Sequence, residues 1–200
     1  MDVNIILFDD FETLDAFGPV EILGRIESYT LRYFSLQGGI VKSRQGLRVE
    51  TVPLMKAASD GIVLLPGGQG TRMLVNEVSF LSAFTDMVQN AAYCLTVCTG
   101  SAVLAKTGLL DRRKATSNKN AFDWVKKINE KVNWQRRARW SVDGKYYTSS
   151  GVSAGMDMAL GFVSDRFGRE KASAIAVSIE YVWNDDQSND LFAKTGKSDV

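Results

Sequence analysis

The sequence contains no histidine among its 200 residues, and this absence excludes several kinds of functional site. The chain by itself has neither a Cys-His pair nor a Ser-His-Asp triad to serve as catalytic machinery. A zinc site is not expected either, because only two cysteines are present and imidazole is the usual companion ligand. We therefore expect neither a metal ion nor a cofactor in the functional site.

Cysteine is also scarce, and Cys94 and Cys98 are the two in the chain. If both lie on one strand, their Cα atoms are about 13 Å apart at ~3.3 Å per residue, whereas a disulfide needs less than ~7 Å. We expect both thiols to be reduced, which fits a cytoplasmic protein.

Long apolar runs and a strong net charge are both missing. No stretch approaches the roughly 20 apolar residues of a membrane span, and residues 1–5 have no basic region of the kind that begins a signal peptide. The net charge is +1, so we expect no partnership with nucleic acid or membrane. The basic stretch 136–139, although flanked by Trp134 and Trp140, is interpreted as a solvated hairpin face.

Strands and helices alternate within one expected domain, residues 1–183, and a polar, loosely held tail follows, residues 184–200. The alternation predicts a mostly parallel sheet with helices on both faces. Apolar runs predict strands at residues 3–8, 30–35, 61–65 and 92–97, and the Asp143-Gly144 turn predicts a type I′ hairpin of residues 139–142 and 145–148. Helices are expected at residues 79–90, 101–107, 121–128, 153–167 and 169–182, and from Gly18-Pro19 to about Ile26.

The most informative segment runs from Ala92 to Ser101, where an apolar strand ends at Cys98 and turns into a helix at Thr99-Gly100-Ser101. A helix N-terminus favours negative charge, so this position predicts a stabilised thiolate and a reactive cysteine. The spacing resembles the nucleophile elbow, with Gly100 two residues after the nucleophile, although Thr96 replaces the motif's first glycine. The alternative is a buried thiol that fills space, with Thr99 and Ser101 serving only to cap the helix.

Two further segments should meet Cys98, because the carboxyl ends of parallel strands lie at one edge of a sheet. Gly67 and Gly68 follow one strand; the N–H of Gly68, with that of Thr99, is a candidate oxyanion hole, and a plain turn is the alternative. Asp15 follows the first strand. Its carboxyl group, partly protonated next to a thiolate, is a candidate general acid, and a helix cap or solvated turn residue is the alternative.

Four blocks of the sequence resemble the ThiJ/PfpI superfamily, a branch of the class I glutamine amidotransferase-like fold, over residues 3–183. The blocks are residues 14–23, 65–68, 97–101 and 151–160. The resemblance implies a flavodoxin-like three-layer α/β sandwich, a homodimer and a small-molecule substrate. It also implies a reactive cysteine at Cys98, with Asp15 as its carboxylate partner and Gly68 and Thr99 as backbone donors.

Within the superfamily, Asp15 and Thr99 resemble the isonitrile (isocyanide) hydratase branch. Val152 falls where the family packs a small apolar residue close to the cysteine's helix, and Asn118 stands where relatives often have a histidine. Glyoxalase-, deglycase- and protease-like activities, which rely on histidine or on glutamate at position 15, are therefore less expected. Related transcription regulators add a C-terminal helix-turn-helix region, for which we expect this chain to be too short.

Three functional hypotheses follow. The first is an isonitrile hydratase-like enzyme, in which the thiolate of Cys98 attacks the isocyanide carbon and Asp15 moves protons, so that an N-substituted formamide is released. The second is a redox- or metabolite-sensing protein without turnover, in which Cys98 is reversibly oxidised. The third is a binding domain that has lost catalysis.

Overall fold

The computed structural model describes residues 1–58 and 60–194. Eight strands form one central sheet. In spatial order they are β3 (Gly39–Lys42), β4 (Arg48–Pro53), β2 (Thr30–Ser35), β1 (Asp2–Ile6), β5 (Ile62–Leu65), β6 (Tyr93–Thr96), β10 (Tyr146–Ser149) and β9 (Trp140–Asp143). Pairing is antiparallel only at the two edges, between β3 and β4 and between β9 and β10. The predicted mostly parallel sheet is therefore confirmed.

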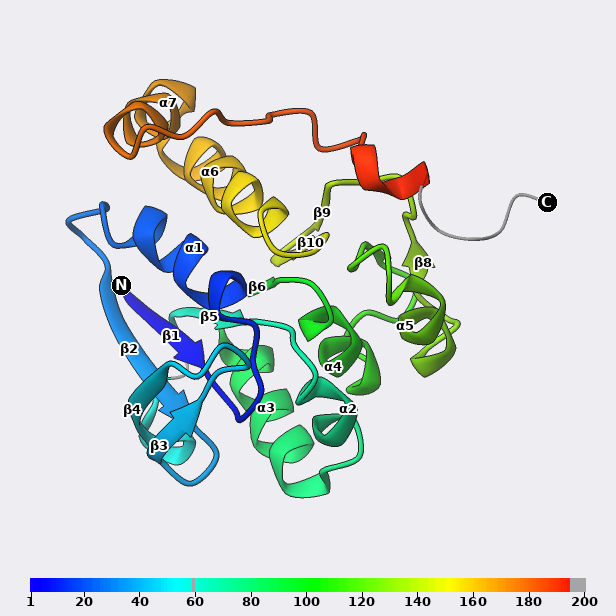
Figure 1. Ribbon diagram of the computed structural model, residues 1–200. Helices are drawn as coiled ribbons and strands as arrows, with labels where there is room; N and C mark the ends of the chain where they lie inside the picture. The colour runs from blue at the N-terminus through cyan, green and yellow to red at the C-terminus, as the bar shows by residue number, and fades with distance from the viewer. Residues whose placement is uncertain (59, 195–200) are drawn as a thin grey trace.

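Helices cover both faces of the sheet (Figure 1). One face carries α1 (Thr13–Leu23), α6 (Ala154–Phe167) and α7 (Arg169–Ser178), and the other carries α2 (Thr71–Leu74), α3 (Val78–Asn90), α4 (Gly100–Lys106) and α5 (Phe122–Ile128). The shorter elements are η1 (Leu54–Lys56), η2 (Leu191–Lys194) and the paired strands β7 (Lys114–Ala115) and β8 (Asn133–Trp134). This arrangement confirms the expected flavodoxin-like three-layer sandwich.

The core lies along the central strands, which are covered on both sides. All four residues of β5 are fully buried, as an apolar run in a parallel strand predicts. Tyr93 and Tyr147 each contact Phe162 of α6 edge to face, with ring centroids 5.1 Å apart.

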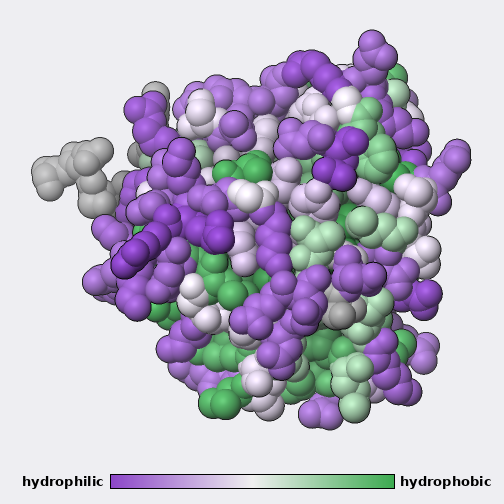
Figure 2. All heavy atoms as spheres, turned by 180° about the vertical axis from the view of Figure 1, so that it is seen from behind, coloured by the Kyte–Doolittle hydropathy of each residue, from purple (hydrophilic) through white to green (hydrophobic). Residues whose placement is uncertain are grey.

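Figure 2 shows that hydrophilic residues dominate the face seen from behind, with smaller apolar areas between them. Within the described residues, no helix has the length and apolarity needed to cross a membrane.

The first helix begins earlier than predicted. It runs over Thr13–Leu23, so Gly18 and Pro19 lie in its interior. Gly18 instead permits close packing, because a Cβ atom there would lie 2.7 Å from Cγ of Met156 in α6. A proline inside a helix removes one backbone hydrogen bond, and the packing of α1 against α6 outweighs this local cost. The earlier start places Asp15 within the first turn of α1.

The predicted hairpin forms, but its turn is shifted by one residue. Asp143 pairs with Tyr146, so the two loop residues are Gly144 and Lys145. Of these, only Gly144 has a positive φ, of 60°. A type I′ turn needs a positive φ at both loop residues, so the expected type I′ turn at Asp143-Gly144 is wrong.

The last helix ends at Ser178, four residues before the predicted end. Glu180 adopts a φ of 53°, which lies outside the helical region. The N–H of Tyr181 then turns back to the carbonyl of Ala176 at 2.9 Å, an arrangement that closes a helix C-terminus.

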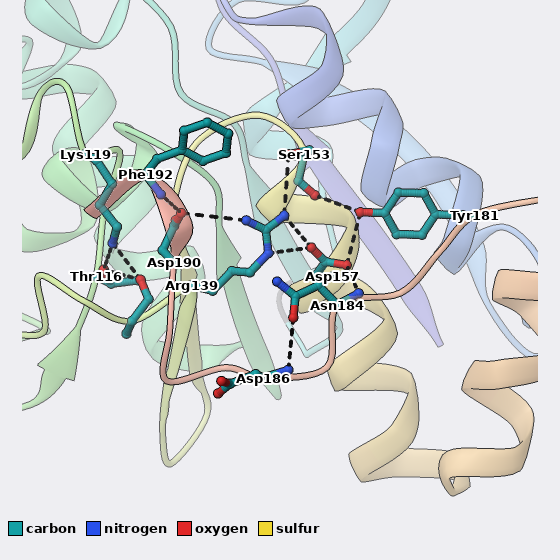
Figure 3. Close-up of polar contacts among 11 residues, drawn as sticks. Thr116, Lys119, Arg139, Ser153, Asp157, Tyr181, Asn184, Asp186, Asp190 and Phe192 are labelled. Carbon is teal, nitrogen blue, oxygen red and sulfur yellow. Dashed lines mark hydrogen bonds and ion pairs between the residues drawn. The ribbon is translucent and has the colours of Figure 1, made fainter. Parts of the chain in front are cut away.

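Residues 184–194 are fastened to the domain, so the expectation of a loosely held tail is wrong for them (Figure 3). The N–H of Asn184 donates to Oδ1 of the fully buried Asp157 at 3.0 Å, and the N–H of Asp190 donates to the carbonyl of Arg137 at 2.7 Å. Arg139 lies between the two acids, 2.5 Å from Asp157 and 3.8 Å from Asp190. The domain boundary at residue 183 stays a prediction, and residues 195–200 lie outside the described part of the chain.

Candidate active site

Segments far apart in the sequence meet at the carboxyl ends of β5 and β6. Gly67 follows β5, Cys98 follows β6, and Asp15 comes from the first turn of α1. The N–H of Gly67 donates to Oδ2 of Asp15 at 3.0 Å. The carboxyl group of Asp15 is also hydrogen-bonded to the thiol of Cys98. The three predicted segments therefore converge as expected.

Cys98 stands on a strained turn between β6 and α4. Its φ is 55°, in the left-handed region that non-glycine residues seldom occupy. Neighbouring glycines make room for this turn. A Cβ atom on Gly67 would lie 2.5 Å from the nitrogen of Thr99, and one on Gly100 would lie 2.6 Å from the carbonyl oxygen of Leu65. The turn holds the thiol in one position, as a nucleophile elbow does.

The backbone carbonyl of Cys98 is fixed from behind by two hydroxyl groups. Ser101 donates to it at 3.0 Å and Ser117 at 2.9 Å, and both serines are buried. Ser101, a predicted neighbour of the site, therefore supports the cysteine's backbone and does not line the cavity in front of the thiol.

Asp15 is fully buried, and both of its carboxyl oxygens accept hydrogen bonds. Besides the bond from Gly67, Oδ1 accepts one of 3.0 Å from the N–H of Val152. Glu12 is the residue at the N-cap of α1, and its side chain makes no capping hydrogen bond. Asp15 is thus neither a helix cap nor a solvated turn residue, and these two alternatives are removed.

Burial sets the protonation of the pair. It raises the pKa of Asp15 to about 7, against the lowering effect of the backbone donors. Burial also raises the pKa of the Cys98 thiol well above its ordinary value, and the charge of Asp15 raises it further. The thiolate stabilisation predicted from the helix N-terminus is therefore outweighed at a thiol that is 7% exposed. Near neutral pH the pair retains at least one proton.

The two predicted backbone donors have different positions. The N–H of Thr99 is hydrogen-bonded to the sulfur of Cys98 and lowers the pKa of the thiol. The N–H of Gly68 instead donates to Oγ1 of Thr99 at 3.0 Å. Gly68 therefore acts on the site through the side chain of Thr99, and its expected place in an oxyanion hole is occupied by that hydroxyl group.

Val152 contacts the carboxyl group of Asp15 through its backbone N–H, and its backbone is strained. Its φ is 50°, which is a rare conformation for a β-branched residue, and its N–H binds Asp15. The side chain lines the cavity in front of Cys98 and is 38% exposed. Strained backbone on both sides of one carboxyl group is typical of a functional site.

Asn118 lies close to the thiol. A Cβ atom on Gly151 would lie 2.1 Å from Nδ2 of Asn118 and 3.6 Å from Sγ of Cys98, so the amide of Asn118 packs directly against the backbone of Gly151 beside the thiol. Oδ1 of Asn118 accepts the N–H of Ala121 at 3.1 Å. This bond leaves the amide nitrogen as the part of the side chain that faces the site.

A cavity of about 370 Å³ opens in front of Cys98, Thr99 and Asn118. Three charged residues that the sequence did not single out also line it, namely Glu12, Arg44 and Arg72. Arg44 belongs to an edge hairpin with no clear apolar pattern, whereas Arg72 follows the glycines after β5, which was an available signal.

A larger hollow of about 450 Å³ lies near Asp2, at the other end of β1, and contains no cysteine. Within residues 1–58 and 60–194, no cluster of acidic or cysteine side chains is suited to hold a metal ion.

The curated proteins that are similar to this chain include an enzyme and a transcriptional regulator. The chain is 26% identical to an isonitrile hydratase of Pseudomonas putida, over 90% of this chain and 78% of that enzyme. It is 30% identical to the HTH-type transcriptional regulator GbdR of Pseudomonas aeruginosa, over 90% of this chain and 50% of the regulator. The chain thus spans half the length of the regulator that it matches.

A solved structure and a family profile are also similar to this chain. A ThiJ/PfpI family protein from Pseudomonas syringae superimposes with a TM-score of 0.82 at 25% identity, covering 90% of this chain and 74% of that one. The profile of the DJ-1/PfpI family matches residues 1–165. Since this match covers all eight strands of the central sheet together with Asp15, Cys98 and Val152, the chain belongs to the DJ-1/PfpI family.

Proposed function

We propose that the protein is a cysteine-dependent enzyme that adds water to an isocyanide and releases an N-substituted formamide. The observation that carries the proposal is the buried Asp15–Cys98 pair, which holds a transferable proton near neutral pH in a chain without histidine. The similarity to an isonitrile hydratase supports the choice of reaction.

In the first step, the sulfur of Cys98 forms a bond to the terminal carbon of the isocyanide. Ionised Asp15 takes the proton of the Cys98 thiol as this bond forms and gives it to the same carbon, which yields a thioimidate and leaves Asp15 ionised again. A carboxyl group with a pKa of about 7 suits this exchange, because it donates and accepts protons with equal ease near neutrality.

In the second step, ionised Asp15 takes a proton from water as the hydroxide bonds to the thioimidate carbon, and the nitrogen receives that proton. The carbon–sulfur bond then breaks and the hydroxyl proton returns to the pair, which releases the formamide. The N–H of Thr99 stabilises the departing thiolate. The net change is the addition of one water molecule, and the pair regains its starting proton.

The test is formamide production from a small aryl isocyanide by the wild type and by Cys98→Ala, Asp15→Asn and Cys94→Ala. Cys94 is the matched control, because it is a fully buried thiol on β6 that lies outside the cavity. We expect turnover to disappear in the first two variants and to persist in the third. Full activity in Cys98→Ala would exclude the mechanism.

The alternative of a cysteine-based redox sensor needs a thiolate at neutral pH. Burial raises the pKa of Cys98 and opposes this requirement, whereas in the proposed reaction Asp15 takes the thiol proton as the sulfur attacks, and this difference places the sensor second. A wild type without turnover whose Cys98 is oxidised by peroxide in preference to Cys94, as read by mass spectrometry, would reverse the order. A Cys98 inert to alkylating reagents as well would favour the third hypothesis, a binding domain.

We also propose that the protein forms a homodimer and acts in the cytoplasm. The family resemblance supports the dimer, and two free cysteines, Cys94 and Cys98, support a reducing compartment. Light scattering coupled to size-exclusion chromatography tests the dimer, which a single species of 22.1 kDa would exclude.

A further inference from the structure

Two arginines on the wall of the Cys98 cavity have no part in the mechanism above. Arg44 comes from the loop between β3 and β4, and Arg72 comes from α2. Among the described residues, neither guanidinium group forms an ion pair with a carboxylate. Two arginines from separate elements therefore face one cavity without a carboxylate partner. This arrangement indicates that the cavity binds a negatively charged ligand.

Arg72 is held in place before any ligand arrives. Its guanidinium carbon lies 4.0 Å from the ring centroid of Trp124, which is a cation–π contact. Its Nη1 donates to Oγ1 of Thr71 at 3.4 Å. A guanidinium group has five N–H donors in a planar fork, so most of the donors of Arg72 are left for a ligand at a fixed position.

Negative charge on the same wall is limited. Among residues 1–58 and 60–194, Glu12 is the one carboxylate side chain that lines this cavity, and its Oε1 accepts a bond of 2.6 Å from Nε2 of Gln45. Asp15, beneath the cavity, is partly protonated near neutral pH because burial raises its pKa to about 7. The wall therefore carries a surplus of one positive charge, which suits a ligand with a single negative charge.

We propose that the substrate of this cavity carries a carboxylate, which Arg44 and Arg72 bind while the reactive carbon faces Cys98. The inference rests on the proposed function in one respect, since it describes the far end of the isocyanide. The planar fork of arginine matches a carboxylate in two parallel hydrogen bonds. A doubly charged phosphate would exceed the surplus charge of the wall, so a monoanion is the better fit.

The test compares two thiol reagents of the same shape, 3-maleimidopropionate and 3-maleimidopropionamide, which differ in one carboxylate. Labelling of Cys98 is followed by mass spectrometry in the wild type, in Arg44→Gln, in Arg72→Gln and in the double variant. Arg48→Gln is the matched control, because Arg48 is an exposed arginine on β4 outside the cavity. Arg72→Lys keeps the charge but removes the fork.

We expect the ratio of the labelling rates, carboxylate over amide, to fall about tenfold in the double variant, as the loss of a charge-assisted hydrogen bond implies. The ratio should stay at the wild-type value in Arg48→Gln and fall by an intermediate factor in Arg72→Lys. An equal ratio in the wild type and the double variant would overturn the proposal.

Labelling requires the thiol but no isocyanide chemistry, so it separates this inference from the proposed reaction. If isocyanides are not turned over and the labelling ratio still depends on the arginines, the reaction is wrong and the carboxylate site stands. If neither reagent labels Cys98, thermal unfolding decides. A rise in the midpoint with phenylpropionate but not with phenylpropionamide, absent in the double variant, supports the site, and equal midpoints overturn it.

Discussion

Replacing Asp15 with asparagine should flatten the dependence of stability on pH between the unfolded-state pKa of 3.8 and the native pKa of about 7. Within this window, the folded protein keeps a proton that the unfolded chain has released. Each pH unit then lowers the free energy of unfolding by about 1.4 kcal/mol, which gives about 4 kcal/mol over the whole window. Solvent does not screen this carboxyl group, because Asp15 is fully buried.

The free energy of unfolding falls as the pH rises, because the pKa of Asp15 is higher in the folded protein than in the unfolded chain. Because the native pKa of Asp15 is raised, the stabilisation is complete below the unfolded-state pKa of 3.8 and is lost as the pH rises through about 7. The chain has no histidine to titrate in this range. Burial also raises the pKa of Asp157, which adds a slope of the same sign, so the difference between wild type and Asp15→Asn isolates Asp15.

The assay is urea unfolding of the wild type, Asp15→Asn and Asp86→Asn across this pH window, where Asp86 is an exposed carboxyl group on α3. Asparagine has one acceptor oxygen, so one of the two backbone donors to position 15 loses its partner at a cost of about 1–3 kcal/mol at every pH. Against that constant offset, the wild type should lose about 3–4 kcal/mol relative to Asp15→Asn as the pH rises. A difference that stays constant to within about 1 kcal/mol would show that the pKa of Asp15 is not raised in the folded protein.

Three further changes probe the surrounding structure. Arg139→Met should lower stability by about 3–5 kcal/mol, because two buried carboxylates lose their cation; a thermal midpoint that falls by only a degree or two would contradict this. Val152→Gly should stabilise the protein by about 1 kcal/mol in urea unfolding, because it releases a φ of 50° at a β-branched residue, and destabilisation would show that the position is unstrained. Gly151→Ala should displace Asn118, since the new Cβ atom would lie 2.1 Å from its Nδ2. We expect kcat/KM with the isocyanide to fall by about tenfold or more, and an unchanged value would remove Asn118 from the site.

Local sequence patterns were enough to predict the elements at the centre of the fold. The buried strand β5, the strand that ends before Cys98 and the helix after it follow from apolar runs and glycines within short segments. The edge hairpin of β3 and β4 was not found, because its residues are mostly exposed and lack a continuous apolar run. The attachment of residues 184–194 also depends on contacts of Asn184 with Asp157 and of Asp190 with Arg139, which are distant in the sequence and which no local pattern reveals.

The convergence of Asp15, Gly67 and Cys98 was predictable from the sequence, because each follows a strand that ends at the same edge of a parallel sheet. The location of the proton at that site was not predictable, because it depends on contacts that exist only in the folded protein. Asp15 is bound by the N–H of Val152, 137 positions away, and its pKa is governed by burial among segments that the chain brings together only on folding. The positions of Arg44 and Arg72 on one cavity wall likewise result from segments that come together only on folding. Burial and electrostatic interaction depend on distance in space, whereas the sequence orders residues only along the chain.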